Sequence, residues 1–262
     1  MYSRSGIKSH RVSFDFYVTP AIKFLLIANF AVFIFEALLY RFSGPPAYGE
    51  LLQWFGLVPA RVILYLWQPF TYLFLHDLGS IWHILMNMFT LWMFGRELEL
   101  VWGRNRFLRY YFMTGVGAGL VNVIVKMAPA LFGQGIPRTA YIPTIGASGA
   151  IFGILVACAI LFPGRRVYVF PLPVPLSMRT VVILMTVVTF LGTFGLGADN
   201  VSHLCHLGGM LVGYVYLRRG SFLHSLRNSV SDWQHRRNQR RFQIYLGKHR
   251  KDPPSRPDNW VN

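Results

Sequence analysis

The sequence has little charge and few acidic residues. Only 14% of its 262 residues are charged, against roughly 25% in an average soluble domain. Apolar residues make up 53% of the chain, and they come in long blocks rather than at the spacing of amphipathic helices or half-buried strands. This composition excludes a soluble globular, a disordered and a collagen-like protein.

Cysteine is also scarce. Cys158 and Cys205, the two cysteines of the chain, both lie within apolar runs. Neither a disulfide framework nor a cysteine-based zinc site is indicated. The 26 Lys and Arg against 10 Asp and Glu give a net charge of +16, which in a soluble protein would suggest nucleic acid. Here the basic residues border apolar blocks, and we expect a lipid bilayer and no nucleic acid as partner.

The apolar blocks have the length of membrane-spanning helices, which need about 20 mostly apolar residues. The first block follows a basic start and resembles a signal peptide, but no small-residue cleavage site follows it, so we interpret it as a retained span. The sequence therefore predicts an all-α polytopic membrane protein with six transmembrane helices and a long interfacial loop, residues 42–79, after the first. The six blocks cover residues 21–40, 80–100, 107–128, 146–163, 176–196 and 201–217.

The basic residues predict the orientation of these helices, because Lys and Arg concentrate in cytoplasmic loops. With both termini in the cytoplasm, only four of the 26 Lys and Arg lie outside: Arg41, Arg61, Lys126 and Arg138. We expect three regions: a cytoplasmic N-terminal segment (1–20), a six-helix membrane domain (21–218) and a flexible, basic cytoplasmic tail (219–262). Anionic lipid headgroups are the expected contact of the tail.

Polar side chains gather near the start of the second, fourth and sixth blocks. His83 and Asn87, Ser148, and His203 with His206 occupy these starts. With the N-terminus inside, all three starts lie at the external side. A residue five positions into a helix lies about 7 Å along its axis, so these side chains share one shallow level below the external surface. Polar groups in a span are costly and indicate function.

A hydroxyl beside an imidazole is suited to nucleophilic catalysis, because serine needs a general base to remove its proton. Ser148 lies within Gly146-Ala147-Ser148-Gly149, in the first turn of its helix, where free N–H groups favour an oxyanion. His83 and Asn87, four residues apart, share one helical face and can donate hydrogen bonds to it. The pairs Gly149/Gly153 and Gly209/Gly213 allow the fourth and sixth helices to approach closely.

These motifs resemble those of the rhomboid family of intramembrane serine proteases, over about residues 20–218. The resemblance rests on the order and placement of four motifs, each weak alone. They are Gly146-Ala147-Ser148-Gly149 (the Gly-x-Ser-Gly motif), His83 with Asn87 (His-x-x-x-Asn), His206-Leu207-Gly208-Gly209 with Gly213, and the glycines of Gly95-x3-Glu99-x3-Gly103.

The resemblance implies a catalytic dyad that cleaves transmembrane segments of membrane proteins, with no metal or cofactor. Ser148 would be the nucleophile and His206 the general base and acid. His83, Asn87 and the backbone N–H of Ser148 would form the oxyanion hole. Residues 176–200 would form a lateral gate for substrate. Supporting positions are Gly146, Gly149, Gly209 and Phe152, the last packing on the imidazole.

The chain departs from the family pattern in the first loop, and three other functions are to be weighed. Many members have a Trp-Arg pair in the first loop, where this chain has Trp67-Gln68. A zinc protease using His83, His203 and His206 would need a His-Glu-x-x-His helix or an acid near the metal, and the chain has neither. A transporter would have its polar residues at the midplane of the bilayer, whereas the polar residues of this chain are expected near one surface. A catalytically weak or inert rhomboid-like protein would bind transmembrane clients without cutting them. We expect a bacterial inner membrane as the location.

Overall fold

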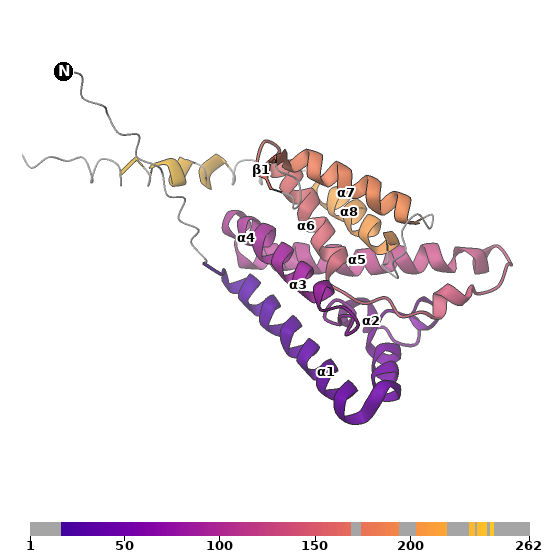
Figure 1. Ribbon diagram of the computed structural model, residues 1–262. Helices are drawn as coiled ribbons and strands as arrows, with labels where there is room; N and C mark the ends of the chain where they lie inside the picture. The colour runs from indigo at the N-terminus through magenta and orange to yellow at the C-terminus, as the bar shows by residue number, and fades with distance from the viewer. Residues whose placement is uncertain are drawn as a thin grey trace, which may run out of the picture.

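The computed structural model describes residues 17–168, 174–193, 203–218, 231–233, 235–239 and 242–243. These residues are mainly α-helical (Figure 1), which confirms the predicted all-α class, and each of the six predicted blocks is helical over most of its length. The long segments are α1 (Pro20–Phe55), α3 (Ile81–Thr90) continued by a π-helical turn (Leu91–Gly95) and α4 (Arg96–Trp102), α5 (Arg104–Leu131), α6 (Ser148–Leu161), α7 (Met178–Thr193) and α8 (His203–Arg218).

Shorter elements lie in the connections. The loop after α1 contains a 3-10 helix (Pro59–Arg61) and α2 (Gln68–Thr71), and a second 3-10 helix (Arg138–Tyr141) precedes α6. Two strands of two residues each, β1 (Arg166–Val167) and β2 (Leu176–Ser177), pair antiparallel between α6 and α7.

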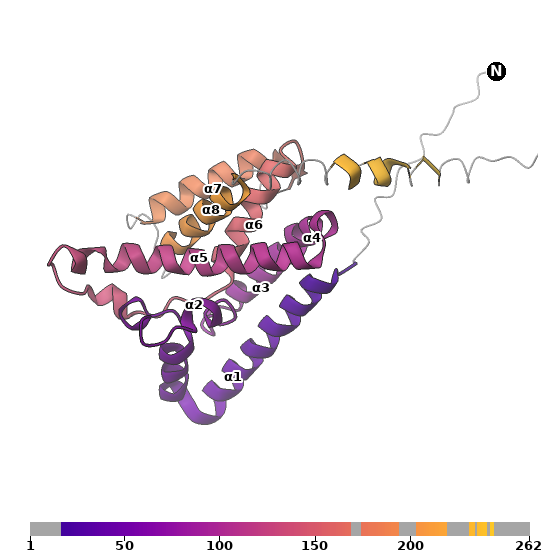
Figure 2. The same ribbon diagram turned by 180° about the vertical axis from the view of Figure 1, so that it is seen from behind.

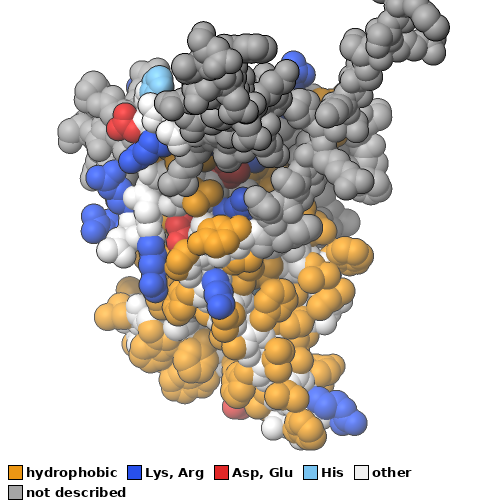
Figure 3. Space-filling view, turned by 90° about the vertical axis from the view of Figure 1, so that its left-hand side faces the viewer, with side chains coloured by type: hydrophobic (Ala, Val, Ile, Leu, Met, Phe, Trp, Pro, Cys, Tyr) orange, Lys and Arg blue, Asp and Glu red, His pale blue; other side chains and the backbone are white. Residues whose placement is uncertain are grey.

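Two helices, α1 and α5, are long and apolar enough to cross a membrane by length and composition, and α6 and α7 are shorter apolar helices. Large hydrophobic side chains on several helices point outward; Ile34 and Phe35 on α1 and Ile183 and Val188 on α7 are more than half exposed. In the space-filling view, hydrophobic side chains cover much of the surface, and most of the Lys and Arg side chains in view lie toward the top (Figure 3).

The sequence Gly44-Pro45-Pro46 breaks α1 into two arms. Gly44 has φ 82°, a conformation that glycine adopts without strain, and the two prolines that follow lack the N–H needed to continue the helical ladder. The chain reverses here and rises again as a second helical arm that ends at Phe55 (Figure 1). The region predicted only as an interfacial loop therefore begins with a helix.

Glu99 of α4 holds the beginning of α1. Its carboxylate accepts hydrogen bonds from the hydroxyl of Thr19 and from the backbone N–H groups of Ala21 (2.8 Å) and Ile22 (3.1 Å). The first N–H groups of a helix have no partner within the helix, so a buried carboxylate there satisfies them. Glu99 therefore caps the start of a helix other than its own.

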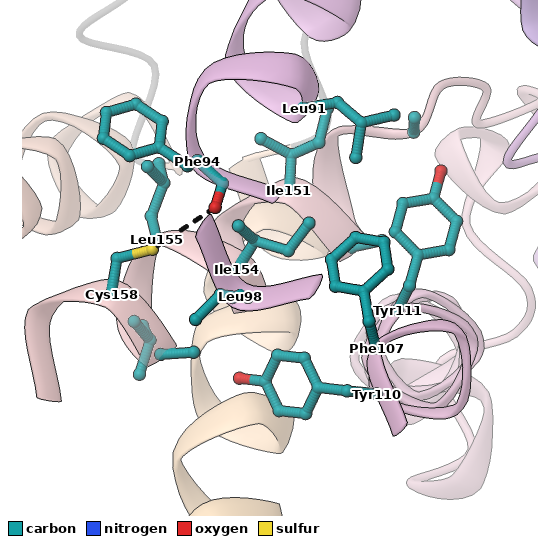
Figure 4. Close-up of a cluster of buried hydrophobic side chains, with 14 of the residues drawn as sticks. Leu91, Phe94, Leu98, Phe107, Tyr110, Tyr111, Ile151, Ile154, Leu155 and Cys158 are labelled. Atoms are coloured by element: carbon teal, nitrogen blue, oxygen red, sulfur yellow. Dashed lines mark hydrogen bonds between the residues drawn. The ribbon is translucent and has the colours of Figure 1, made fainter. Parts of the chain in front are cut away.

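The core lies between the α3–α4 segment, α5 and α6. Leu91, Phe94 and Leu98 of the first segment face Phe107, Tyr110 and Tyr111 of α5 and Ile151, Ile154 and Leu155 of α6 (Figure 4). The hydroxyl of Tyr110 donates a hydrogen bond of 2.8 Å to the carbonyl of Gly153, which joins α5 to α6.

Helix α8 packs against both α5 and α6 (Figure 2). A Cβ at Gly209 would fall on the carbonyl oxygen of Gly149, and one at Gly213 would lie 2.6 Å from the hydroxyl of Tyr110. Small residues thus bring the backbones of α6 and α8 into contact, the packing used between membrane helices. This contact sets the distance between the side chains at the N-terminal ends of these helices.

Most of the predicted flexible tail lies outside the described residues, and its described parts are helical. The ring of Trp233 lies 6.5 Å from that of Phe162, just after α6, and the guanidinium of Arg237 lies 5.0 Å from the ring of Trp233. This part of the tail contacts the α6–α7 connection.

Candidate active site

The segment before α6 places Ser148 at the first position of the helix. Leu57 and Thr144 exchange two backbone hydrogen bonds of 2.9 and 2.8 Å, and the N–H of Gly146 donates to the carbonyl of Tyr72 (2.9 Å). Gly146 has φ 115°, which disfavours any residue with a side chain. The turn at Gly146 therefore delivers the Ser148 hydroxyl to the N-terminal end of α6.

Ser148 and His206 form the central contact of the site. The Nε2 atom of His206, on α8, lies 2.8 Å from the Oγ atom of Ser148 on α6. The imidazole is 8% exposed, and Ser148 is half-buried. This is the distance at which an imidazole can accept a hydroxyl proton. The structure thus brings together the two residues expected to form the dyad.

Two rings hold the imidazole of His206. The ring of Phe152, one turn after Ser148 on α6, stacks on it with centroids 4.2 Å apart and planes 19° apart. The ring of His203 meets it edge-on, at 6.1 Å and 90°. Phe152 therefore lies where the resemblance places an aromatic support, and His203 adds a second contact that the sequence did not indicate.

His83 presents a hydrogen-bond donor beside the turn that precedes Ser148. Its Nδ1 accepts the backbone N–H of Asp77 at 3.3 Å, so the neutral ring carries its proton on Nε2. That Nε2 would lie only 3.0 Å from a Cβ at Gly146. The arrangement makes His83 a donor directed toward the Ser148 turn, and glycine at 146 provides the space for it.

Asn87 is placed differently from His83. Its side chain is buried, and Nδ2 donates a hydrogen bond of 2.9 Å to the carbonyl of His83 in its own helix. Among the described residues its amide makes no hydrogen bond to Ser148. Asn87 lies on the expected helical face, but the bond that the structure shows supports the helix around His83.

The remaining expectations concern the gate and metal binding. Helix α7 covers most of the expected gate, while residues 194–200 lie outside the described residues. A Cβ at Gly192 of α7 would lie 2.5 Å from the Nε2 of His203, so α7 packs closely on α8 near the dyad. Within the described ranges, no three His, Cys, Asp or Glu side chains are grouped so that they could hold a metal ion.

Gln68 replaces the arginine expected in the first loop and ties that loop together. It is fully buried, its Nε2 donates to the carbonyl of Gln53 (2.8 Å), and its Oε1 accepts the N–H of Val58 (3.0 Å). Trp67, beside it, donates to the carbonyl of Trp54 (2.9 Å). Sequence reasoning missed this role because a lone glutamine gives no signal of its partners.

Comparison with known proteins agrees with this arrangement. Residues 64–221 match the family model described as the rhomboid domain, and the chain belongs to the rhomboid family. It is therefore an integral membrane protein, as its apolar helices indicate.

Relatives include mitochondrial and bacterial proteins. "Rhomboid protein 1, mitochondrial" of Saccharomyces cerevisiae is 32% identical over 135 residues, 52% of this chain and 37% of that protein. "Presenilin-associated rhomboid-like protein, mitochondrial" of Homo sapiens is 31% identical over 144 residues, 54% and 35% of the two chains. "Rhomboid protease GluP" of Bacillus subtilis is 28% identical over 199 residues, 74% and 34%. The matches span about a third of the length of these relatives.

Proposed function

We propose that the chain is an intramembrane serine endopeptidase that cleaves transmembrane segments of membrane proteins. The observation that carries the proposal is the 2.8 Å contact between His206 Nε2 and Ser148 Oγ at the N-terminus of α6. A serine hydroxyl that is paired with a neutral imidazole and adjoins the free N–H groups of a helix combines a nucleophile, its base and an anion site.

The proposed reaction follows from these positions. His206 Nε2 takes the proton of Ser148 as Oγ attacks the peptide carbonyl carbon, and the carbonyl oxygen becomes an oxyanion. The Ser148 backbone N–H and the Nε2–H of His83 donate to that oxyanion, and Asn87 is the third proposed donor. His206 then protonates the leaving amine, and water hydrolyses the acyl-enzyme with His206 again acting as base.

A dyad accounts for the described contacts without a third member. Among the described residues, no carboxylate is hydrogen-bonded to His206; its neighbours there are Ser148, Phe152 and His203. Asp199, the acid closest in sequence, lies outside the described residues. We assign the orientation of the imidazole to the stack on Phe152, a role that an aspartate has in the Ser-His-Asp triad.

The six helical segments and the distribution of basic residues support the proposal of six membrane spans. The site then lies near the external surface, where water can reach it, and α7 borders it as the proposed gate. Substrates would be helices that unwind locally near small or helix-breaking residues, because the hydrogen bonds of an intact helix shield its peptide bonds. Supporting positions are Gly146, Gly149 and Gly209, which set the turn and the α6–α8 distance.

The relatives support the protease and leave an alternative open. One relative is named a protease, GluP, whereas others are named only as rhomboid or rhomboid-like proteins. A weakly active or inert protein that binds transmembrane clients is the second candidate. The bacterial inner membrane gains no support over a mitochondrial membrane from these names and stays a prediction.

Cleavage of a single-span test protein in liposomes tests the proposal. We expect the wild type to cut the substrate, and we expect Ser148→Ala and His206→Ala each to reduce the rate at least a thousandfold, as for other serine nucleophiles and bases that act as a unit. A chelator should leave the rate unchanged. Cleavage by Ser148→Ala at the wild-type rate would refute the nucleophile, and a folded wild type that binds substrate without cutting it would favour the client-binding candidate.

A further inference from the structure

Glu36 is an acid buried on the membrane helix α1, and the proposed reaction does not use it. Its side chain is fully buried, two turns before the break at Gly44. Acidic side chains inside a span are costly and indicate a specific role. Among the described residues, Glu36 is hydrogen-bonded to the loop that precedes α3: its Oε2 accepts the backbone N–H of His76 at 3.1 Å.

His76 is held from several sides. It is fully buried, its Nδ1 lies 3.2 Å from the carbonyl of Phe74, and its own carbonyl accepts the hydroxyl of Tyr48 at 3.4 Å. Tyr48 belongs to the second arm of α1, so the two arms of this helix hold the N–H and the C=O of the same residue. The ring of His76 lies 5.3 Å from the ring of His83.

The next peptide N–H, that of Asp77, donates to Nδ1 of His83. Because peptide groups are planar, the Asp77 N–H shares its plane with the C=O of His76, which Tyr48 holds. Glu36 holds the adjoining peptide plane, through the N–H of His76. The side chain of Asp77 accepts the N–H of Gly79 at 2.9 Å. The chain of contacts therefore runs from Glu36 through the His76–Asp77 backbone to His83.

We propose that Glu36 is a positioning residue for His83. By holding the peptide before His76, while Tyr48 holds the peptide after it, Glu36 keeps the N–H of Asp77 on Nδ1 of His83. The ring proton therefore stays on Nε2 and faces the Ser148 turn. Without Glu36, His83 can place its proton on Nδ1 and turn an acceptor toward the developing oxyanion, which repels it. The proposal rests on the proposed function, since it assigns a cause to one oxyanion donor.

A purely structural role would predict something else. If Glu36 only ties the loop to α1, its replacement lowers the unfolding temperature and the yield, but folded enzyme keeps the wild-type kcat and the wild-type His83 tautomer. The positioning role predicts a lower kcat in folded enzyme with KM little changed, because an oxyanion donor acts in the transition state.

The experiment compares Glu36→Leu, Glu36→Gln and Tyr48→Phe in the full chain in liposomes. Removing a whole oxyanion donor costs about 10²–10³ in kcat, and we expect at least a tenfold fall in kcat for Glu36→Leu. Glu36→Gln keeps an oxygen acceptor and should stay within about threefold of wild type. Tyr48→Phe releases the carbonyl of His76, which shares its peptide plane with the Asp77 N–H, and should lower kcat in the same direction as Glu36→Leu.

Nitrogen-15 spectra of the histidine rings provide the second measurement, with the His83 signal assigned from a His83→Asn variant. We expect protonated Nε2 and unprotonated Nδ1 in the wild type, and a mixture of tautomers in Glu36→Leu. A folded Glu36→Leu with wild-type kcat and tautomer would overturn the proposal, as would Glu36→Gln losing as much as Glu36→Leu. If Glu36→Leu does not fold, Glu36→Asp, shorter by one methylene, takes its place under the same criteria. Failure of the dyad itself would show separately, as activity retained by Ser148→Ala.

Discussion

At the scale of single residues, the imidazole of His206 is hydrogen-bonded to Ser148 and stacked on Phe152 within the described part of the chain. The bond to Ser148 fixes one ring nitrogen, and the ring of Phe152 fixes the plane. A general base must keep both its position and its direction to accept a proton. The two contacts come from the same helix, α6, so the nucleophile and the support of its base move together.

Replacing Phe152 tests this support. Aromatic stacking contributes about 0.5–1.5 kcal/mol beyond the area that it buries, which corresponds to a two- to twelvefold change in rate. We expect Phe152→Leu, which keeps apolar volume without a flat face, to lower the kcat for a test substrate by about this amount, and Phe152→Tyr to restore it. Wild-type kcat in Phe152→Leu would contradict the supporting role.

His76 predicts how stability depends on pH. Burial, and secondarily the nearby His83, lower the pKa of His76 from 6.5 to about 3. Between these values the unfolded chain binds a proton that the folded protein does not, so stability is complete above about pH 6.5 and falls as the pH drops toward 3. One proton contributes at most about 1.4 kcal/mol per pH unit.

Thermal unfolding in detergent between pH 7 and pH 4 measures this effect. We expect the unfolding temperature of the wild type to fall more steeply with acidification than that of His76→Gln, which has no ring to protonate. The comparison isolates His76 from the other histidines, which both proteins share. Equal slopes in the two proteins would show that His76 is not buried in its neutral form.

At the scale of elements, the contact between α6 and α8 sets the distance within the dyad. Gly209→Ala would place a methyl group on the carbonyl oxygen of Gly149, and overpacking typically costs about 1–3 kcal/mol. We expect a lower unfolding temperature and a loss of cleavage, because α8 carries His206. The matched control is Gly49→Ala, where a Cβ meets nothing within 4 Å; it should cleave at the wild-type rate. Equal behaviour of the two variants would contradict the packing.

From the sequence, the position of the dyad could be predicted, but most of the contacts that surround it could not. Ser148 and His206 could be paired because the direction of each span fixes which helix ends share a level, and the glycines indicate which helices approach. The sequence analysis missed the second arm of α1 because its apolar residues are also typical of a loop that lies in the membrane interface. The bonds of Gln68 and Glu36 could not be predicted, since each joins segments that only the folded chain brings together.

At the scale of the whole molecule, the orientation in the membrane can be tested with engineered cysteines. Arg138 and Arg104 are exposed and are predicted to lie on opposite sides of the membrane, and the native Cys158 and Cys205 are buried. A membrane-impermeant thiol reagent added outside should label Arg138→Cys in sealed vesicles of native orientation, and Arg104→Cys only after permeabilisation. The unmodified chain supplies the background. External labelling of Arg104→Cys would contradict the six-span arrangement.

The central claim is that His206 activates Ser148 as a nucleophile. A serine-reactive fluorophosphonate followed by peptide mass spectrometry tests it most directly, because the reagent forms a covalent bond with the attacking oxygen and needs no knowledge of the substrate. We predict one phosphonyl adduct, on Ser148, in the folded wild type, no adduct in Ser148→Ala, and labelling at least a hundredfold slower in His206→Ala. An adduct on another residue, or labelling of Ser148 at the wild-type rate without His206, would contradict the account.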